Sequence, residues 1–185
     1  IIKLWSIDVI FPANPLVIDF LDKNRYKIPI KIAIPEGKAL SITRSKQNTY
    51  NILKNLIPTP NIYIGNPNLY NYPIFIKPDS LYGSQGTRLL TSVEEYEIHP
   101  KNQSEICCEY LPGEEYTVDC FTNSKGQLLF AGVRTRERIR MGTSMHCEPA
   151  DEITKKLLIE YAKKIQSKVN ITGPWFFQVK RSKDN

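Results

Sequence analysis

The pattern of apolar residues changes near the prolines of residues 58–60, and this change is the feature that most limits the fold. Before it, short apolar runs at 3–11 and 31–34 predict buried strands. Each run is followed by helical spacing, first in residues 17–26 and then from Ser45 onward. The order strand, helix, strand, helix is typical of a doubly wound α/β layer.

After this point the sequence predicts antiparallel hairpins instead. Short alternating or apolar runs, separated by glycine, proline or asparagine turns, predict strands at 73–78, 87–90, 105–111, 115–121, 127–133 and 175–181. Apolar positions at helical spacing predict a long helix over residues 153–169. The fold class is therefore α/β in the first part and α+β in the second.

Composition excludes several classes of protein. No apolar run reaches the ~18–20 residues that a membrane span needs, and the first residues lack the layout of a signal peptide. We therefore expect no membrane partner and a cytoplasmic location. The chain begins with Ile1 rather than Met, which suggests a fragment.

The net charge of +6 is unevenly divided and does not indicate a nucleic-acid partner. Residues 1–58 contain nine basic and four acidic side chains, whereas residues 59–185 contain sixteen and fifteen. Neither part has the run of Lys and Arg that a nucleic-acid-binding arm would have. Cations can still gather locally around an anion.

The cysteines do not favour a metal site. Cys107 and Cys108 are adjacent and would point to opposite faces of a strand, and the sequence has no C-x2-C pair. Only His146, beside Cys147, offers a nearby imidazole. We expect all four cysteines, Cys107, Cys108, Cys120 and Cys147, to be reduced, because the chain lacks a secretory signal.

Three patterns carry chemistry, and the first is a strand lysine followed by a glycine-bearing loop. Lys77-Pro78 ends a predicted strand, and the glycines at 83 and 86 follow closely. Backbone N–H groups of such a loop can approach phosphate oxygens while the lysine adds positive charge. No G-K-[ST] follows, so this is not a P-loop. Taken alone, the pattern fits an ordinary hairpin turn with a surface lysine better.

The second pattern is a strand that ends in a Pro-Gly turn, Glu109-Tyr110-Leu111 followed by residues 112–113 and two glutamates. The last backbone groups of such a strand can bind an adenine edge, and a carboxylate soon afterwards can accept both ribose hydroxyls. A hairpin with solvated glutamates is the alternative, and it is favoured if the segment is taken alone.

The third pattern is a series of four arginines spaced by two, at positions 134, 136, 138 and 140. If this segment is one strand, all four guanidinium groups leave the same face. Aligned like charges repel unless an anion or a carboxylate lies among them. An anion-binding face is therefore favoured over a solvated face interleaved with Glu137.

In this order and spacing, the patterns resemble the ATP-grasp superfamily, in particular its carbamoyl-phosphate-synthase-like members. Residues 73–90 resemble the strand with the phosphate-binding lysine and its glycine-rich flap, and residues 107–121 resemble the adenine hinge and ribose carboxylate. Residues 173–185 resemble the strand that brings the first metal ligand, and residues 44–60 resemble the helix before the grasp domain. The resemblance covers about residues 30–185.

The resemblance implies a division of the chain and a set of site residues. Residues 1–44 would be the C-terminal part of a pre-ATP-grasp, Rossmann-like domain, and residues 45–185 an incomplete two-subdomain ATP-grasp fold. Lys46 and Lys77 would hold the nucleotide phosphates, and the flap over them would be Gly83, Ser84, Gln85 and Gly86. Glu109, Tyr110 and Leu111 would form the adenine hinge, and the Glu115 carboxylate would bind the ribose. Gln178 would be the metal ligand, and Arg134 and Arg136 would lie at the γ-phosphate or the acceptor carboxylate.

One departure from the family concerns the metal site. In the family, a hairpin and a Glu-x-Asn-x-Arg segment follow the strand that here carries Gln178, and they complete the magnesium site. The sequence stops at Asn185, before such a segment, so we expect the metal site to be incomplete here.

The resemblance implies an enzyme that uses ATP and Mg²⁺, with Mn²⁺ as an alternative, to activate a carboxylate or bicarbonate as an acyl phosphate. An amine would then attack, so the implied partners are ATP and a small carboxylate–amine pair, with a homodimer or a larger synthetase assembly left open. The alternative function is a nucleotide-binding subunit or regulatory module that binds ATP without turnover.

Overall fold

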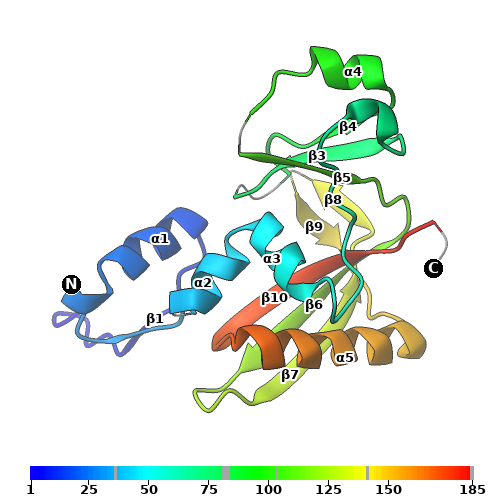
Figure 1. The fold of residues 1–185 in the computed structure, drawn as a ribbon. Helices are drawn as coiled ribbons and strands as arrows, with labels where there is room; N and C mark the ends of the chain where they lie inside the picture. The colour runs from blue at the N-terminus through cyan, green and yellow to red at the C-terminus, as the bar shows by residue number, and fades with distance from the viewer. Residues whose placement is uncertain (36, 81–83, 103, 141, 184–185) are drawn as a thin grey trace.

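The structure is a computed structural model that describes residues 1–35, 37–80, 84–102, 104–140 and 142–183. It has an N-terminal part, a small sheet carrying α4, and a second sheet covered by α5 (Figure 1). In Figure 1 the first sheet lies at the top, the second at the bottom, and α3 between the N-terminal part and both. Among the described residues, no helix is long and apolar enough to cross a membrane.

The N-terminal part follows the predicted alternation of strands and helices. Its elements are β1 (Val9–Ile10), α1 (Pro15–Lys23), η1 (Arg25–Lys27), β2 (Lys31–Ile32) and α2 (Gly37–Thr43). Asn14 caps α1 by accepting a hydrogen bond from the Leu16 N–H at 2.9 Å. β1 and β2 pair in parallel, as strands separated by a helix do in α/β layers. The predicted fold class is confirmed here, although α2 was not predicted.

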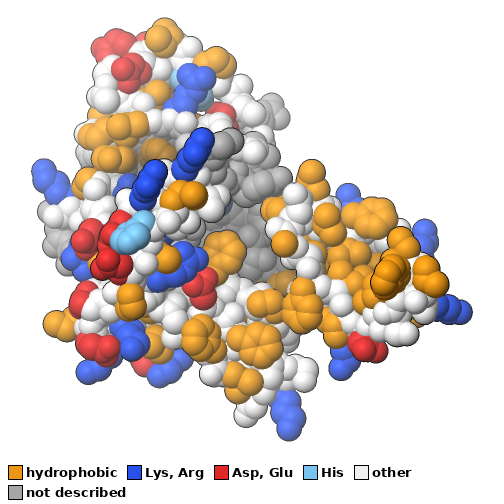
Figure 2. Space-filling view, turned by 180° about the vertical axis from the view of Figure 1, so that it is seen from behind, with side chains coloured by type: hydrophobic (Ala, Val, Ile, Leu, Met, Phe, Trp, Pro, Cys, Tyr) orange, Lys and Arg blue, Asp and Glu red, His pale blue; other side chains and the backbone are white. Residues whose placement is uncertain are grey.

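The prediction of a buried strand over residues 3–11 is wrong in length and in burial. The strand covers only Val9–Ile10, and Trp5 and Phe11 are 72% and 67% exposed. Among the described residues, β1 pairs only with β2, which is also two residues long and cannot support a longer strand. Figure 2 shows many hydrophobic side chains on the surface of this part of the molecule.

α3 (Lys46–Leu53) connects the parts of the molecule, and it begins where the sequence predicts. Ser45 caps it by accepting from the Asn48 N–H at 3.1 Å. Leu53 near its end packs with Ile165 of the long helix in one core cluster. α3 therefore reaches from the core of the second sheet to the end of the first.

The first sheet confirms the predicted hairpin around the glycine-bearing loop. It has the order β4-β3-β5 with antiparallel pairing throughout. Its strands and neighbours are β3 (Ile74–Pro78), β4 (Arg88–Leu90), β5 (Glu105–Glu109), η2 (Pro67–Leu69) and α4 (Val93–Ile98). Ile74 and Ile76 are buried in a cluster with Tyr70 and Leu90. Lys77 alternates to the other face.

The second sheet has the order β10-β6-β7, also antiparallel. It is made of β6 (Glu115–Thr122), β7 (Leu128–Thr135) and β10 (Gly173–Lys180), and α5 (Glu152–Val169) covers one face. Val118 and Val133 on that face pack with Leu158 and Ala162 of α5. The predicted hairpin, long helix and final strand are confirmed.

A short hairpin, β8 (Arg138–Arg140) paired with β9 (Thr143–His146), follows the second sheet. The four arginines therefore do not lie on one strand, because β7 ends at Thr135 and β8 begins at Arg138. The condition for a single arginine face does not hold, and Arg138 and Arg140 are exposed on the separate hairpin.

Candidate functional site

Two lysines distant in sequence meet where β3 ends. The α3 N-terminus is tied to this end, because Asp79 Oδ1 accepts from the Gln47 N–H at 2.7 Å. Lys46 Nζ donates to the carbonyl oxygens of Pro78 and Asp79 at 2.7 and 3.0 Å. Burial, and then the positive charge of Lys77, lower the pKa of Lys46. The fold thus holds two cations close enough to repel.

Tyr50 holds the second lysine in place. Lys77 Nζ donates to the Tyr50 hydroxyl at 2.6 Å and lies 5.1 Å from the centre of its ring. Tyr50 stands one helical turn after Lys46, so one face of α3 positions both lysines. The i, i+4 spacing of Tyr50 from Lys46 is the sequence signal that could have revealed this role.

The glycine-bearing loop returns to the same strand end. Gly83 lies outside the described residues, whereas Ser84, Gln85 and Gly86 are described and exposed. Gly86 has φ +68°, and a Cβ there would lie 2.9 Å from Pro78 Cγ, so glycine is required for this close approach. The exposed backbone of residues 84–86 therefore lies next to the strand that carries Lys77.

The hinge segment follows β5, and part of its hydrogen-bonding capacity is used within the protein. The Glu109 N–H donates to the Asn61 carbonyl at 3.0 Å, and the Glu109 carboxylate accepts from Asn61 Nδ2 at 2.6 Å. The Leu111 N–H makes no hydrogen bond with any described residue. Tyr110 has the Lys180 ammonium 5.5 Å from its ring centre. Adenine could therefore reach the Leu111 N–H but not the Glu109 N–H.

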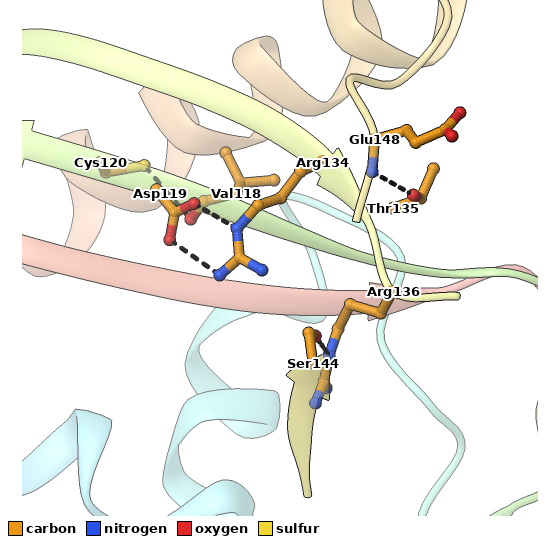
Figure 3. Close-up of polar contacts among 8 residues, drawn as sticks. All are labelled: Val118, Asp119, Cys120, Arg134, Thr135, Arg136, Ser144 and Glu148. Carbon is orange, nitrogen blue, oxygen red and sulfur yellow. Dashed lines mark hydrogen bonds and ion pairs between the residues drawn. The ribbon is translucent and has the colours of Figure 1, made fainter. Parts of the chain in front are cut away.

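The face of the second sheet opposite α5 carries other predicted site residues, of which Figure 3 shows Arg134. Arg134 of β7, Thr117 of β6 and Gln178 of β10 are direct cross-strand partners and share this face. Arg134 is held by Asp119, with Nε 2.7 Å from Oδ2 and Nη2 3.4 Å from Oδ1. The Asp119 contact raises the pKa of Arg134. A shallow cavity of about 270 Å³ adjoins this pair.

Arg136 and Glu115 form a separate, more buried pair. The Arg136 side chain is 5% exposed and Glu115 is 24% exposed, and Nη1 donates to Glu115 Oε1. Arg136 also donates to Ser144 Oγ at 2.8 Å and to the Gly142 carbonyl at 2.6 Å. These contacts join β6 to the short hairpin. Catalysis by Arg136 and ribose binding by Glu115 stay predictions, and in this structure both groups hold each other.

The residues around Gln178 partly fit a hard cation such as Mg²⁺, which binds oxygen ligands. Gln178 is exposed, and its amide oxygen is one such ligand. The carboxylates of Asp119 and Glu115 on the same face are paired with Arg134 and Arg136. Among the described carboxylate and amide groups of this row, the Gln178 amide therefore offers the one oxygen ligand that is not held in an ion pair.

A second group that could hold a metal lies on the short hairpin and was not predicted. The ligand atoms of Glu137, His146 and Glu148 lie within 4.8 Å of one another, and all three residues are exposed. Figure 2 shows a histidine among acidic side chains on the surface, with Lys or Arg side chains beside it. His146 Nδ1 lies 2.8 Å from Glu137 Oε2, so this group also forms an ordinary polar contact on the surface.

Comparisons with known sequences and structures bear on the fold of the chain. Residues 101–185 match a family described as ATP-grasp in the biosynthetic pathway with Ter operon. No curated protein sequence matches the chain.

Solved structures match over nearly the whole chain. The biotin carboxylase–β,γ-ATP complex from Campylobacter jejuni is 18% identical, with TM-score 0.82 over 99% of this chain and 48% of that one. The biotin carboxylase domain of Hydrogenobacter thermophilus 2-oxoglutarate carboxylase is 13% identical, with TM-score 0.80 over 100% and 47%. N5-carboxyaminoimidazole ribonucleotide synthetase from Thermotoga maritima is 19% identical, with TM-score 0.71 over 97% and 49%. The chain spans about half the length of each.

These likenesses define the class: the chain has part of the ATP-grasp fold. The family model matched by residues 101–185 agrees with the ATP-grasp resemblance drawn from the sequence motifs. The particular likeness to carbamoyl-phosphate synthase and the division at residues 44 and 45 stay predictions.

Proposed function

We propose that the protein is an ATP-grasp ligase that uses ATP and Mg²⁺ to activate a carboxylate or bicarbonate as an acyl phosphate, which an amine then attacks. The observation that carries this proposal is the pairing of Lys46 and Lys77 at the end of β3, beside the exposed backbone of residues 84–86. The charge of Asp79 offsets part of the repulsion between the two ammonium groups, and a further anion would offset the rest. A polyphosphate chain supplies that anion.

The residues of this chain would act by positioning and by charge, because phosphoryl transfer needs no covalent protein nucleophile. Lys46 and Lys77 would hold the α- and β-phosphates, and the loop backbone would cover them. The hinge would bind adenine through the Leu111 N–H, and Arg134 would face the acceptor carboxylate from the edge of its cavity. A bound Mg²⁺, with Gln178 among its ligands, would neutralise charge on the transferred phosphoryl group.

The solved relatives support the substrate class through what their names state. One is a complex of biotin carboxylase with a β,γ-ATP compound, and another contains MgADP and bicarbonate. The second is also described as a domain dimer, which makes a homodimer the oligomer that we propose for this protein. A cytoplasmic location stays a prediction.

The proposal is tested by measuring ADP formation by the full-length protein with Mg²⁺, bicarbonate or small carboxylates, and hydroxylamine as the amine. A ligase should release ADP only when a suitable carboxylate is present, and hydroxylamine should trap the acyl phosphate as a hydroxamate. The alternative, a module that binds ATP without turnover, predicts calorimetric ATP binding with no ADP under any of these conditions.

A further inference from the structure

Arg134, Thr117 and Gln178 form a row of side chains across the second sheet, and the Thr117 hydroxyl has no role in the proposed function. Thr117 lies between Arg134 and Gln178, its direct partners on the two neighbouring strands. Side chains in such pairs have Cβ atoms about 4.5–5.5 Å apart. The Thr117 hydroxyl is therefore within reach of both.

This hydroxyl is buried and has no partner among the described residues. Thr117 is 1% exposed, and its Oγ1 makes no hydrogen bond within the part of the chain that the structure describes. Arg134 does not satisfy it, because Nε and Nη2 of Arg134 point along β6 to Asp119 (Figure 3). A buried polar atom without a partner is rare and unfavourable, so its presence indicates a missing contact.

A second threonine on the same strand shows what an ordinary buried hydroxyl does. Thr122 is also 1% exposed, and its Oγ1 accepts a hydrogen bond from Trp175 Nε1 at 2.9 Å. The two threonines of β6 are equally buried but lie on opposite faces of the sheet: Thr122 has a partner, whereas Thr117, in the row with Gln178, has none among the described residues. Burial in β6 therefore does not by itself leave a hydroxyl unpaired.

The side chain of Gln178 has a chemical ambiguity that Thr117 can resolve. Only the amide oxygen can bind a cation, whereas the NH2 end is a donor and repels one. We propose that Thr117 is a positioning residue: its hydroxyl accepts a hydrogen bond from Gln178 Nε2–H and thereby turns Oε1 toward the Mg²⁺ of the bound nucleotide. This inference rests on the proposed function, in which Gln178 is a metal ligand. A glutamate at position 178 would not need such orientation, because both of its carboxylate oxygens can bind a cation.

The test measures how much Mg²⁺ improves the calorimetric affinity of the full-length protein for a non-hydrolysable ATP analogue. Thr117→Val removes the hydroxyl at nearly constant shape and should reduce the gain from Mg²⁺ by roughly tenfold, the lower end for residues that orient metal ligands. Affinity without Mg²⁺ should not change. Thr117→Ser keeps the hydroxyl and should keep most of the gain. In a Gln178→Glu background, Thr117→Val should have little effect.

Thermal unfolding separates this role from a structural one. Thr117→Val removes an unpartnered hydroxyl and should leave the melting temperature unchanged or raise it, whereas the control Thr122→Val should lower it without altering the gain from Mg²⁺. If Gln178→Ala lowers the gain but Thr117→Val does not, the positioning role is refuted while the proposed function stands. If neither variant changes the gain, Gln178 is not a metal ligand and the inference fails with that role. An equal effect of Thr117→Val in the Gln178→Glu background would also overturn it.

Discussion

Replacing Glu115 by alanine should destabilise the second sheet by about 3 kcal/mol, because it leaves the buried Arg136 without its carboxylate partner. Arg136 is 5% exposed, and Glu115 is its one carboxylate partner among the described residues. Removing one member of a buried ion pair costs about 3–5 kcal/mol. The lower end applies, since Glu115 itself is 24% exposed and Arg136 keeps its contacts with Ser144 and the Gly142 carbonyl.

Thermal unfolding of the full-length protein measures this effect. For a unit of this size each kcal/mol lowers the melting temperature by about 2–4 °C, so Glu115→Ala should lower it by about 6–12 °C. The double variant Glu115→Ala, Arg136→Met should recover most of the loss, because no buried charge is left. Glu160→Ala is the control: Glu160 and Lys163 are both 58% exposed, and such surface pairs contribute about 0–1 kcal/mol. A loss for Glu115→Ala no larger than the control would refute the reasoning.

Three further results are expected. Burial and the charge of Lys77 hold the pKa of Lys46 below its ordinary value of 10.5. Between the pKa of the folded state and 10.5, the unfolded chain therefore binds more protons than the folded chain, and the free energy of unfolding should rise with pH. Urea unfolding at about pH 8 and about pH 10 should show this rise reduced in Lys46→Met, and an unchanged rise would contradict the assignment. Iodoacetamide at about pH 8 should alkylate exposed Cys147 and spare Cys120, whose burial raises its pKa to about 12; equal labelling by mass spectrometry would show that Cys120 is accessible. Glu115→Gln should weaken ATP binding more than 2′-deoxy-ATP binding in calorimetry, whereas equal losses would leave Glu115 with its structural role alone.

Local signals explain which elements the sequence could predict. Ser45 and Asn14 are helix caps that act within three residues, and the spacing of the long helix and of the hairpin strands depends on neighbours in sequence. The short α2 and α4 escaped prediction because seven and six residues contain too few turns for periodicity to be read. The capping pattern of Ser92 and Glu95 could still have revealed α4, since the Ser92 hydroxyl accepts from the Glu95 N–H at 3.4 Å.

The parts that could not be predicted depend on contacts between distant segments. The apolar run at residues 3–11 fits a buried strand by composition, but burial requires a cover that sequence pattern does not reveal. The spacing of the arginines fits one strand, but β7 ends at Thr135, and the Arg136 side chain bonds Glu115, Ser144 and Gly142. Likewise, the sequence motifs indicated Lys46 and Lys77 separately. Only the folded chain shows that Asp79 ties the start of α3 to the end of β3 and that Tyr50 holds Lys77 there.

The central claim is that the lysine pair at the end of β3 binds the phosphates of ATP, and calorimetric titration of ATP into the full-length protein tests it most directly. Lys77→Met should weaken binding by roughly one to two orders of magnitude, the effect of losing a charge-assisted contact of about 1.5–3 kcal/mol. Lys54→Met, at an exposed position after the end of α3, is the control and should bind ATP like the unaltered protein. Circular dichroism should show both variants folded. If Lys77→Met binds ATP as tightly as Lys54→Met, the phosphates lie elsewhere and the assignment of this site is wrong.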